Sequence, residues 1–461
     1  MNHLLSGLFR AVPLAASSPR LWLSSGMLLL GCLWLMPNGD FRQPEAFVPF
    51  SVGMSMMSAG YVLSWGLRWV PTYWFWGIAL LTRLLLLPMY PGDDVWRYLW
   101  EGYIQTLGFS PYHFAPDAIE LVSYRTEWWS QINHLDVSAI YPPIAQLSFR
   151  VLAAIKPTVF IFKLAFVFAD LSICWLLSRR LGDRSALLYA WNPLILYSFA
   201  GAAHYDSWFI FPLVAAWFSF DGLNASSRSP HQNVIDENSS NQDSPNQDPA
   251  PSNQPLLWSQ TALLVGISVA IKWMSLPILV FLSWQAWKQT RLKQVGWVML
   301  WGGMPLILSV LPFCQDTTCP LIPTESVFVS HGRSAELIPY LTGLLWQSSK
   351  QTNWIYAIPL GATVLWLLWR SKSFLNFTTN YLLALLMLSP IIHAWYFTWI
   401  IPFAAATNNL GVRLVSISAL IYFLLPHRAA MGDPDWFLSP TERLVLWLPL
   451  ILGWVWSSVQ R

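Results

Sequence analysis

The sequence predicts an all-α fold, a polytopic bundle of transmembrane helices with one large external loop. Hydrophobic residues make up 55% of the 461 residues and charged residues only 11%, against roughly 25% charged in soluble domains. The chain also contains 30 Trp, a residue that concentrates at membrane–water interfaces. A soluble fold of this size could not cover its surface with so few charges. We therefore expect membrane lipids as partners and no nucleic acid.

Apolar runs bounded by charged residues, Pro or polar clusters mark the expected spans, each of which needs about 20 residues. Because several runs are short, we expect about 11 to 14 crossings. The first run follows Arg10 and Arg20 and contains Cys32 in a Leu-Leu-Gly-Cys sequence, which partly imitates a lipoprotein cleavage site. It continues past the cysteine, which favours an uncleaved helix. The expected spans are 21–36, 46–67, 72–90, 157–177, 185–200, 206–220, 257–270, 275–287, 295–312, 353–369, 374–389, 394–406, 412–426 and 443–457.

Two stretches interrupt this pattern. Residues 91–156 mix polar and aromatic side chains, and an ordered loop of this length usually carries function. Residues 221–256 are rich in Asn, Ser, Asp and Pro without apolar anchors, which is typical of a disordered linker. We thus expect an N-terminal transmembrane part (1–220) with an external catalytic loop, a cytoplasmic linker, and a C-terminal transmembrane part (257–461).

Basic residues set the expected orientation, because cytoplasmic loops retain Lys and Arg. With the N-terminus inside, 91–156 lies outside, together with the loops around His204, Lys272 and His393. We expect an integral multi-pass protein of a bacterial plasma membrane with an outward-facing site, since no retention signal is visible. Ten basic residues then fall on the cytoplasmic side: Arg68, Arg179, Arg180, Arg184, Lys288, Arg291, Lys293, Arg370, Lys372 and Arg413.

The cysteines divide into two kinds. Cys32 and Cys174 lie in apolar stretches, where a thiol usually only packs. Cys314 and Cys319 lie in a polar connection between spans. We expect a disulfide between them if that connection faces an oxidising compartment.

The first candidate for chemistry is the segment 92–102. If it is helical, four side chains share one face, and they could hold a sugar hydroxyl or a phosphate at the membrane surface. In the alternative interpretation Asp93 only caps the helix and Arg97 pairs with Glu101 at i+4. The extended Tyr141-Pro-Pro segment would approach the same surface. The four side chains are Asp94, Arg97, Tyr98 and Glu101.

Three further constellations fall on the expected outer side. His204 and Asp206 could bind a metal or a hydroxyl-rich ligand, or Asp206 could simply cap a helix. Lys272 lies between two short apolar stretches and must either snorkel or meet an anion such as a lipid phosphate. His393 and Tyr396 belong to an aromatic run that could also be part of an interfacial belt.

The expected spans also contain charged residues. Lys163 and Asp170 lie seven apart on one helix face and could pair with each other or with Arg83. The sequence contains no Walker loop, dinucleotide fingerprint, nucleophile elbow or metalloprotease signature. Nucleotide-driven transport is therefore disfavoured.

Taken in order, these motifs resemble the landmarks of membrane-embedded C-type (GT-C) glycosyltransferases. The similarity is greatest to bacterial polyprenyl-phosphate-mannose-dependent mannosyltransferases and extends more distantly to the catalytic subunit of GPI mannosyltransferase I. It covers about 300 residues, and the tail after 405 adds no motif. The matching segments are Asp-Asp-Val-Trp-Arg-Tyr-Leu-Trp-Glu-Gly (93–102), Gly-Phe-Ser-Pro-Tyr (108–112), Tyr-Pro-Pro-Ile-Ala-Gln (141–146), His-Tyr-Asp (204–206), Ile-Lys-Trp (271–273) followed by Leu-Pro (276–277), and His-Ala-Trp-Tyr-Phe-Thr-Trp-Ile-Ile-Pro (393–402).

The resemblance implies transfer of a sugar, with mannose favoured, from a polyprenyl-phosphate donor to a glycolipid or glycan acceptor. In the family that the chain resembles, the acidic residue at the start of the external loop acts as, or positions, the base of an inverting displacement, and Asp94 matches it best, with Asp93 second. Lys272 and His393 would then lie near the leaving phosphate. His204 and Asp206 would lie near the sugar or the acceptor.

Several alternatives remain open. Asp93 and Asp94 could hold a divalent cation or work without one. A multi-pass transporter or lipid flippase would also need many spans and internal charges, although it should show two related halves, which the sequence lacks. A third possibility is a non-catalytic subunit of an assembly pathway that uses the acidic loop for docking.

Overall fold

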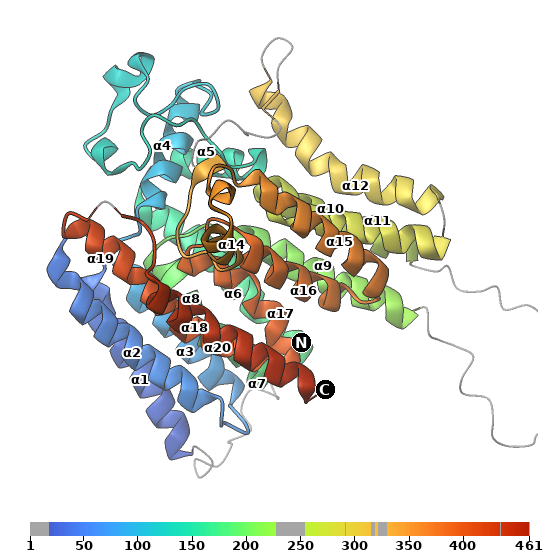
Figure 1. Cartoon of the computed structure of the whole chain (residues 1–461), viewed down its shortest axis with the longest axis horizontal. Coiled ribbons are helices and arrows are strands. Elements are labelled where there is room, and N and C mark those ends of the chain that lie inside the picture. The colour runs from blue at the N-terminus through green and yellow to red at the C-terminus, as the bar shows by residue number, and fades with distance from the viewer. Residues whose placement is uncertain are drawn as a thin grey trace, which may run out of the picture.

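The computed structural model describes residues 18–226, 254–290, 292–314, 319–320, 330–433 and 435–460. Within these ranges the regular elements are all helices (Figure 1). The α-helices are α1 (Pro19–Leu35), α2 (Phe47–Ser64), α3 (Thr72–Leu86), α4 (Asp94–Thr106), α5 (Pro143–Ile155), α6 (Val159–Leu181), α7 (Asp183–Ala190), α8 (Pro193–Leu196), α9 (Ser207–Ser226), α10 (Gln254–Ile271), α11 (Leu276–Thr290), α12 (Leu292–Val310), α14 (Ile338–Leu345), α15 (Ala357–Arg370), α16 (Phe374–Leu388), α17 (Ile401–Thr407), α18 (Leu410–Ser418), α19 (Leu424–Ala430) and α20 (Pro440–Val459).

Among the described residues, six helical stretches are long and apolar enough to cross a membrane. This confirms the predicted polytopic helix bundle. Shorter apolar helices lie beside them, including α3, α15 and α16, so the number of crossings stays a prediction. The six long stretches are Pro19–Asn38, Pro44–Ser64, Val159–Leu181, Leu292–Phe313, Leu410–Ala430 and Pro440–Val459.

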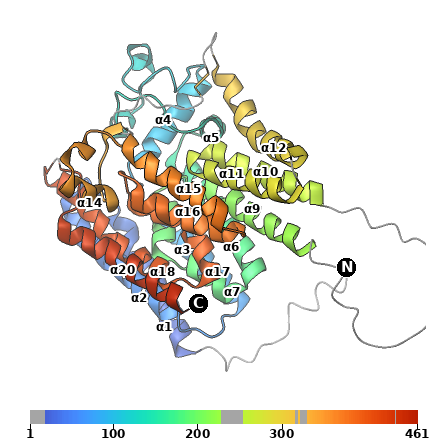
Figure 2. The same ribbon diagram turned by 45° about the vertical axis from the view of Figure 1, so that its right-hand side comes forward.

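Small residues let several helices approach closely. A Cβ on Gly266 of α10 would lie 2.2 Å from the carbonyl oxygen of Gly302 on α12, and one on Gly411 of α18 would lie 2.3 Å from that of Leu450 on α20. Such contacts are typical of helix packing in membranes, where apolar burial alone gives little driving force. In Figures 1 and 2 the 91–156 segment stands at one end of the resulting bundle.

Two of the expected spans are interrupted next to the site, and both corrections bear on it. The run 185–200 is divided at Asn192, whose side chain caps α8, and continues as a π-helical turn over Tyr197–Gly201. The run 394–406 is a 3-10 segment (Ala394–Trp399) followed by α17, with Pro402 in the first turn. Composition marks both runs as apolar but does not reveal these irregular turns, which are tolerated at membrane depth only inside protein.

The segment 91–156 is folded around its own aromatic core. Trp100, Ile104, Leu121 and Ile132 are buried together, and two 3-10 turns, Ile119–Tyr124 and Trp129–Gln131, connect α4 to α5. At the expected linker, α9 extends to Ser226 and α10 begins at Gln254. The linker residues 227–253 lie outside the described residues.

The charges inside the bundle are paired with specific partners. Arg83 Nε donates to Asp170 Oδ2 at 2.8 Å, and Nη1 donates to the carbonyls of Ala79 and Ala190. Lys163 does not pair with Asp170 but donates to the carbonyls of Leu87 and Met89 at 3.1 and 2.6 Å. Lys163 therefore holds the chain just before the acidic motif.

The four cysteines follow the expected division. Cys314 and Cys319 form a disulfide, while Cys32 and Cys174 are free and buried.

Candidate active site

The amino end of α4 is fixed against the segment that carries His204. The backbone N–H of Gly92 donates to the carbonyl of Ala202 at 2.9 Å. A Cβ on Gly92 would lie 3.2 Å from that carbonyl oxygen and 3.7 Å from His204 Nε2. This close approach favours a glycine and brings the first acidic residues of α4 next to His204.

Asp94 meets three side chains from three segments. Its carboxylate lies 3.0 Å from Asn133 Nδ2, 3.4 Å from Tyr98 Oη and 3.5 Å from His204 Nδ1. Asn133 also donates to Asp93 Oδ2 at 3.3 Å. Asp93 occupies the N-cap position, but its side chain makes no capping hydrogen bond. The amide of Asn133 therefore bridges both carboxylates, a role that no sequence motif indicates.

The environments of the two neighbouring acids push their pKa values apart. Burial raises the pKa of Asp94, but the close contact and charge of His204, followed by the charge of His393, outweigh it and hold that pKa well below its usual range. Neighbouring protein atoms partly exclude water from the Asp93 carboxylate, and this desolvation raises its pKa. The negative charge of Asp94 raises that pKa further, by a smaller amount. Opposed shifts of this kind are common at acid–base sites.

Both predicted histidines belong to one stack of rings. The His204 ring lies 3.8 Å from the Trp395 ring, and the His393 ring lies 4.5 Å from Trp395 with planes only 6° apart. Ala203, just before His204, has φ +66°, an uncommon value for a residue other than glycine.

Burial lowers the pKa of His393 to about 3, although Asp94 opposes the shift, so this imidazole is neutral at pH 7.

Lys272 and Asp206 form a second group. Lys272 Nζ pairs directly with Asp206 Oδ1, which also accepts a hydrogen bond of 2.6 Å from Trp399 Nε1. The ammonium lies 4.7 to 5.5 Å from the ring centres of Tyr205, Phe209, Tyr396 and Trp399, a distance suited to cation–π attraction. Lys272 is therefore neither snorkelling nor isolated.

Three tyrosines join the two groups. The ring centres of Tyr98, Tyr141 and Tyr205 lie 5.2 to 5.4 Å from one another. Sequence reasoning did not assign Tyr205 a role, although it stands inside the His-Tyr-Asp motif. Nine of the candidate residues thus form one connected cluster: Asp93, Asp94, Tyr98, Tyr141, His204, Asp206, Lys272, His393 and Tyr396.

Arg97 and Glu101 make their hydrogen bonds to other groups of the protein. Arg97 Nε donates to Glu101 at 2.8 Å, and its other nitrogens donate to the carbonyls of residues 133, 134, 137 and 138. Glu101 also accepts a hydrogen bond of 2.6 Å from Gln146. Both side chains are buried. The i+4 pair of the alternative interpretation is present, and it fixes the loop that carries Asn133.

The ligand set does not favour a metal centre. Within the described ranges no three His, Cys, Asp or Glu side chains converge in a group that could hold a metal ion. The Asp93–Asp94 pair is instead bridged by an amide.

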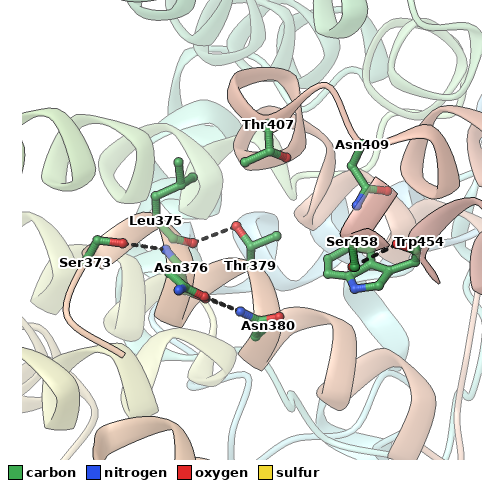
Figure 3. A pocket seen from close by; sticks show the side chains of 9 residues that line it. All are labelled: Ser373, Leu375, Asn376, Thr379, Asn380, Thr407, Asn409, Trp454 and Ser458. Carbon is green, nitrogen blue, oxygen red and sulfur yellow. Dashed lines mark hydrogen bonds between the residues drawn. The ribbon is translucent and has the colours of Figure 1, made fainter. Parts of the chain in front are cut away.

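A separate hollow of about 240 Å³ lies between α16, α20 and the turn before α18 (Figure 3). Its lining holds no carboxylate, histidine or cation. Thr379 donates to the carbonyl of Leu375, Asn380 donates to Asn376, and Ser373 caps α16. These polar groups are satisfied by their own helix, so the hollow offers no chemistry comparable to the cluster around Asp94.

Comparison with known proteins gives a family match. No curated protein and no solved structure matches the chain. A family model described as alpha-(1->6)-mannopyranosyltransferase, N-terminal domain, matches residues 8–289, more than half of the chain. That range contains Asp94, His204 and Lys272, whereas His393 and Tyr396 lie beyond it. The chain belongs to this mannosyltransferase family, and it is an enzyme built as an all-α bundle of membrane helices.

Proposed function

We propose that the protein transfers mannose from a polyprenyl-phosphate donor to a hydroxyl of a glycolipid or glycan acceptor, on the non-cytoplasmic side and with inversion. One observation carries the proposal. In the row of residues 204–206, Tyr205 and Asp206 are 1% exposed, yet Tyr205 Oη and Asp206 Oδ2 have no hydrogen-bond partner among the described residues, and the neighbouring His204 Nδ1 has only its 3.5 Å contact with Asp94. Buried polar atoms are nearly always satisfied, so this row favours a polar ligand that supplies the missing bonds.

Asp94 is the proposed base. Its side chain is 21% exposed and borders the unsatisfied row through His204. In the reaction, the acceptor oxygen bonds to the anomeric carbon while the bond from that carbon to the phosphate oxygen breaks. The hydroxyl proton passes to Asp94, and the electron pair leaves with the phosphate. Attack opposite the leaving group inverts the anomeric carbon.

The phosphate is proposed to bind on the side of Lys272 and His393. An ammonium has three N–H donors and Asp206 accepts from one, so Lys272 can also bind a phosphate oxygen. A neutral His393 would add a hydrogen bond without adding charge. Donors placed where negative charge develops stabilise the transition state more than the ground state.

An apolar groove beside the cluster supports a lipid-borne donor. This groove has a volume of about 270 Å³ and is lined by one face of α5 and by Trp208. Ring contacts of 5.8 Å from Trp208 to Phe149 and 5.7 Å from Phe149 to Tyr205 connect it to the site. An isoprenoid chain in the groove would leave its phosphate at the tyrosine cluster.

The test uses membranes that contain the full chain, labelled polyprenyl-phosphate mannose and native lipids, and follows label into glycolipid. We expect Asp94→Asn to lower the transfer rate at least about 100-fold, because general-base catalysis contributes at least that much. Asp117→Asn is the matched control, since this acid of the same loop is exposed and only its backbone carbonyl bonds Arg125.

Other results would change the proposal. Loss in Asp93→Asn with full activity in Asp94→Asn would move the base to Asp93. If the wild-type chain transfers no sugar from any polyprenyl phosphate while its acceptor lipids are present, the proposed donor is wrong.

A further inference from the structure

His393 is held by two side chains from the C-terminal part of the chain. Its Nδ1 lies 2.5 Å from Tyr422 Oη, and Trp436 Nε1 lies 3.2 Å from the same oxygen. Tyr422 is 2% exposed and belongs to the 3-10 segment Ala419–Phe423, whereas Trp436 precedes α20. Both residues lie beyond the family match at 8–289.

Hydrogen-bond chemistry fixes the direction of these bonds. An indole N–H can only donate, so Tyr422 Oη accepts from Trp436. If His393 Nδ1 also donated, the phenol oxygen would accept twice and its own proton would have no acceptor that the described residues show. The phenol proton therefore points to Nδ1, and a neutral imidazole that accepts at Nδ1 carries its proton on Nε2.

We propose that Tyr422, supported by Trp436, is a positioning residue that keeps His393 in the Nε2–H tautomer, so that this ring acts toward substrate as a hydrogen-bond donor and not as a base. The inference rests on the proposed function, in which His393 faces the leaving phosphate. It divides the cluster chemically: Asp94 takes a proton on one side, and His393 donates a hydrogen bond on the other.

The ring and its backbone are held as such a role requires. Stacking on Trp395 with planes 6° apart fixes the direction of the imidazole edge. One residue earlier, Ser334 Oγ accepts from the N–H of Ile392 at 2.8 Å and donates to its carbonyl at 2.6 Å. Arg443 of α20 in turn donates to the carbonyl of Ser334 at 3.0 Å. These contacts hold the ring plane and the backbone beside His393, and the bond from Tyr422 sets which ring nitrogen carries the proton.

The test is a double-mutant cycle in the transfer assay. We expect Tyr422→Phe to lower kcat about tenfold with KM changed less than twofold, because a bond to the departing phosphate strengthens in the transition state. In His393→Gln the amide supplies an N–H near the position of Nε2 and has no tautomer to fix. Tyr422→Phe added to His393→Gln should therefore change kcat less than twofold further.

Controls separate this role from folding. Tyr356→Phe is the matched variant, since Tyr356 is buried and its hydroxyl donates to the carbonyl of Pro339, away from the cluster. It should keep kcat within twofold. His393→Ala should lose more activity than His393→Gln.

Two outcomes would overturn the inference. If the losses from Tyr422→Phe and His393→Gln multiply, or if Tyr422→Phe is fully active while His393→Ala is not, Tyr422 does not set the tautomer, and the proposed function stands. Full activity of His393→Ala would instead remove His393 from the reaction and would count against the proposed phosphate side as well.

Discussion

Asp94 and Asp170 each meet a basic side chain from another segment, but the two pairs are built differently. Asp170 is fully buried, and its carboxylate accepts hydrogen bonds from two guanidinium nitrogens of Arg83, at 2.8 and 3.3 Å. Asp94 is 21% exposed and lies 3.5 Å from His204, too far for a well-formed hydrogen bond. A fully satisfied pair holds helices together, whereas a loosely held pair at an accessible surface has bonding capacity left for a substrate.

The largest effect on stability should come from the satisfied pair. Arg83→Met leaves the Asp170 carboxylate buried without a partner, which should cost about 3 to 5 kcal/mol. Asp94→Asn should cost less than about 1 kcal/mol, because Asp94 is partly exposed and loosely paired. Thermal unfolding in detergent, monitored by size-exclusion chromatography, measures the loss of stability in both variants.

A matched double variant sharpens the same comparison. Replacing both members with Arg83→Met and Asp170→Leu should recover most of the lost stability, since a buried ion pair rarely outperforms apolar packing. Equal melting temperatures for wild type and Arg83→Met would show that Asp170 is not held by Arg83, and the contrast with Asp94 would fail.

The helix-face argument succeeded where partners lie close in sequence and stopped where they do not. It predicted α4 and put Tyr98 within 3.4 Å of Asp94, because residues four apart meet on a helix. It also offered the Arg97–Glu101 pair, which is present, but it could not predict the four carbonyls, 36 to 41 residues further along the chain, that accept from the other nitrogens of Arg97. Asn133 and Tyr422 carry no charge and no motif, so only the folded chain assigns them to the cluster.

The apolar pattern has a corresponding limit. It located the long helices well, since α6 and α20 agree with runs 157–177 and 443–457 to within a few residues. It read 185–200 and 394–406 as plain spans because it counts apolarity, not backbone geometry. The π-helical turn and the 3-10 segment in these runs place His204 and the aromatic run after His393 in the site.

A pH profile tests whether the Asp94–His204 pair serves catalysis. A base must be deprotonated, and the low pKa of Asp94 keeps it ionised far into the acid range. His204→Gln removes the main group that lowers the pKa of Asp94, so burial then raises that pKa. The acid limb of the rate should then move to higher pH, in addition to a loss at every pH from the ligand contact that His204 makes. An unmoved limb would mean that Asp94 is not the group whose ionisation limits the rate.

The smallest effect concerns the backbone just before His204. Ala203 has φ +66°, which costs a non-glycine residue roughly 1 to 2 kcal/mol, whereas glycine pays more entropy on folding, roughly 0.5 to 1 kcal/mol. Ala203→Gly should therefore stabilise the protein by no more than about 1 kcal/mol. If the turn only positions His204, the transfer rate should stay within twofold. A tenfold loss with unchanged melting temperature would show instead that the strained alanine restrains His204 in the orientation that meets Asp94, so that the loose pair owes its geometry to the backbone and not to the ring stack.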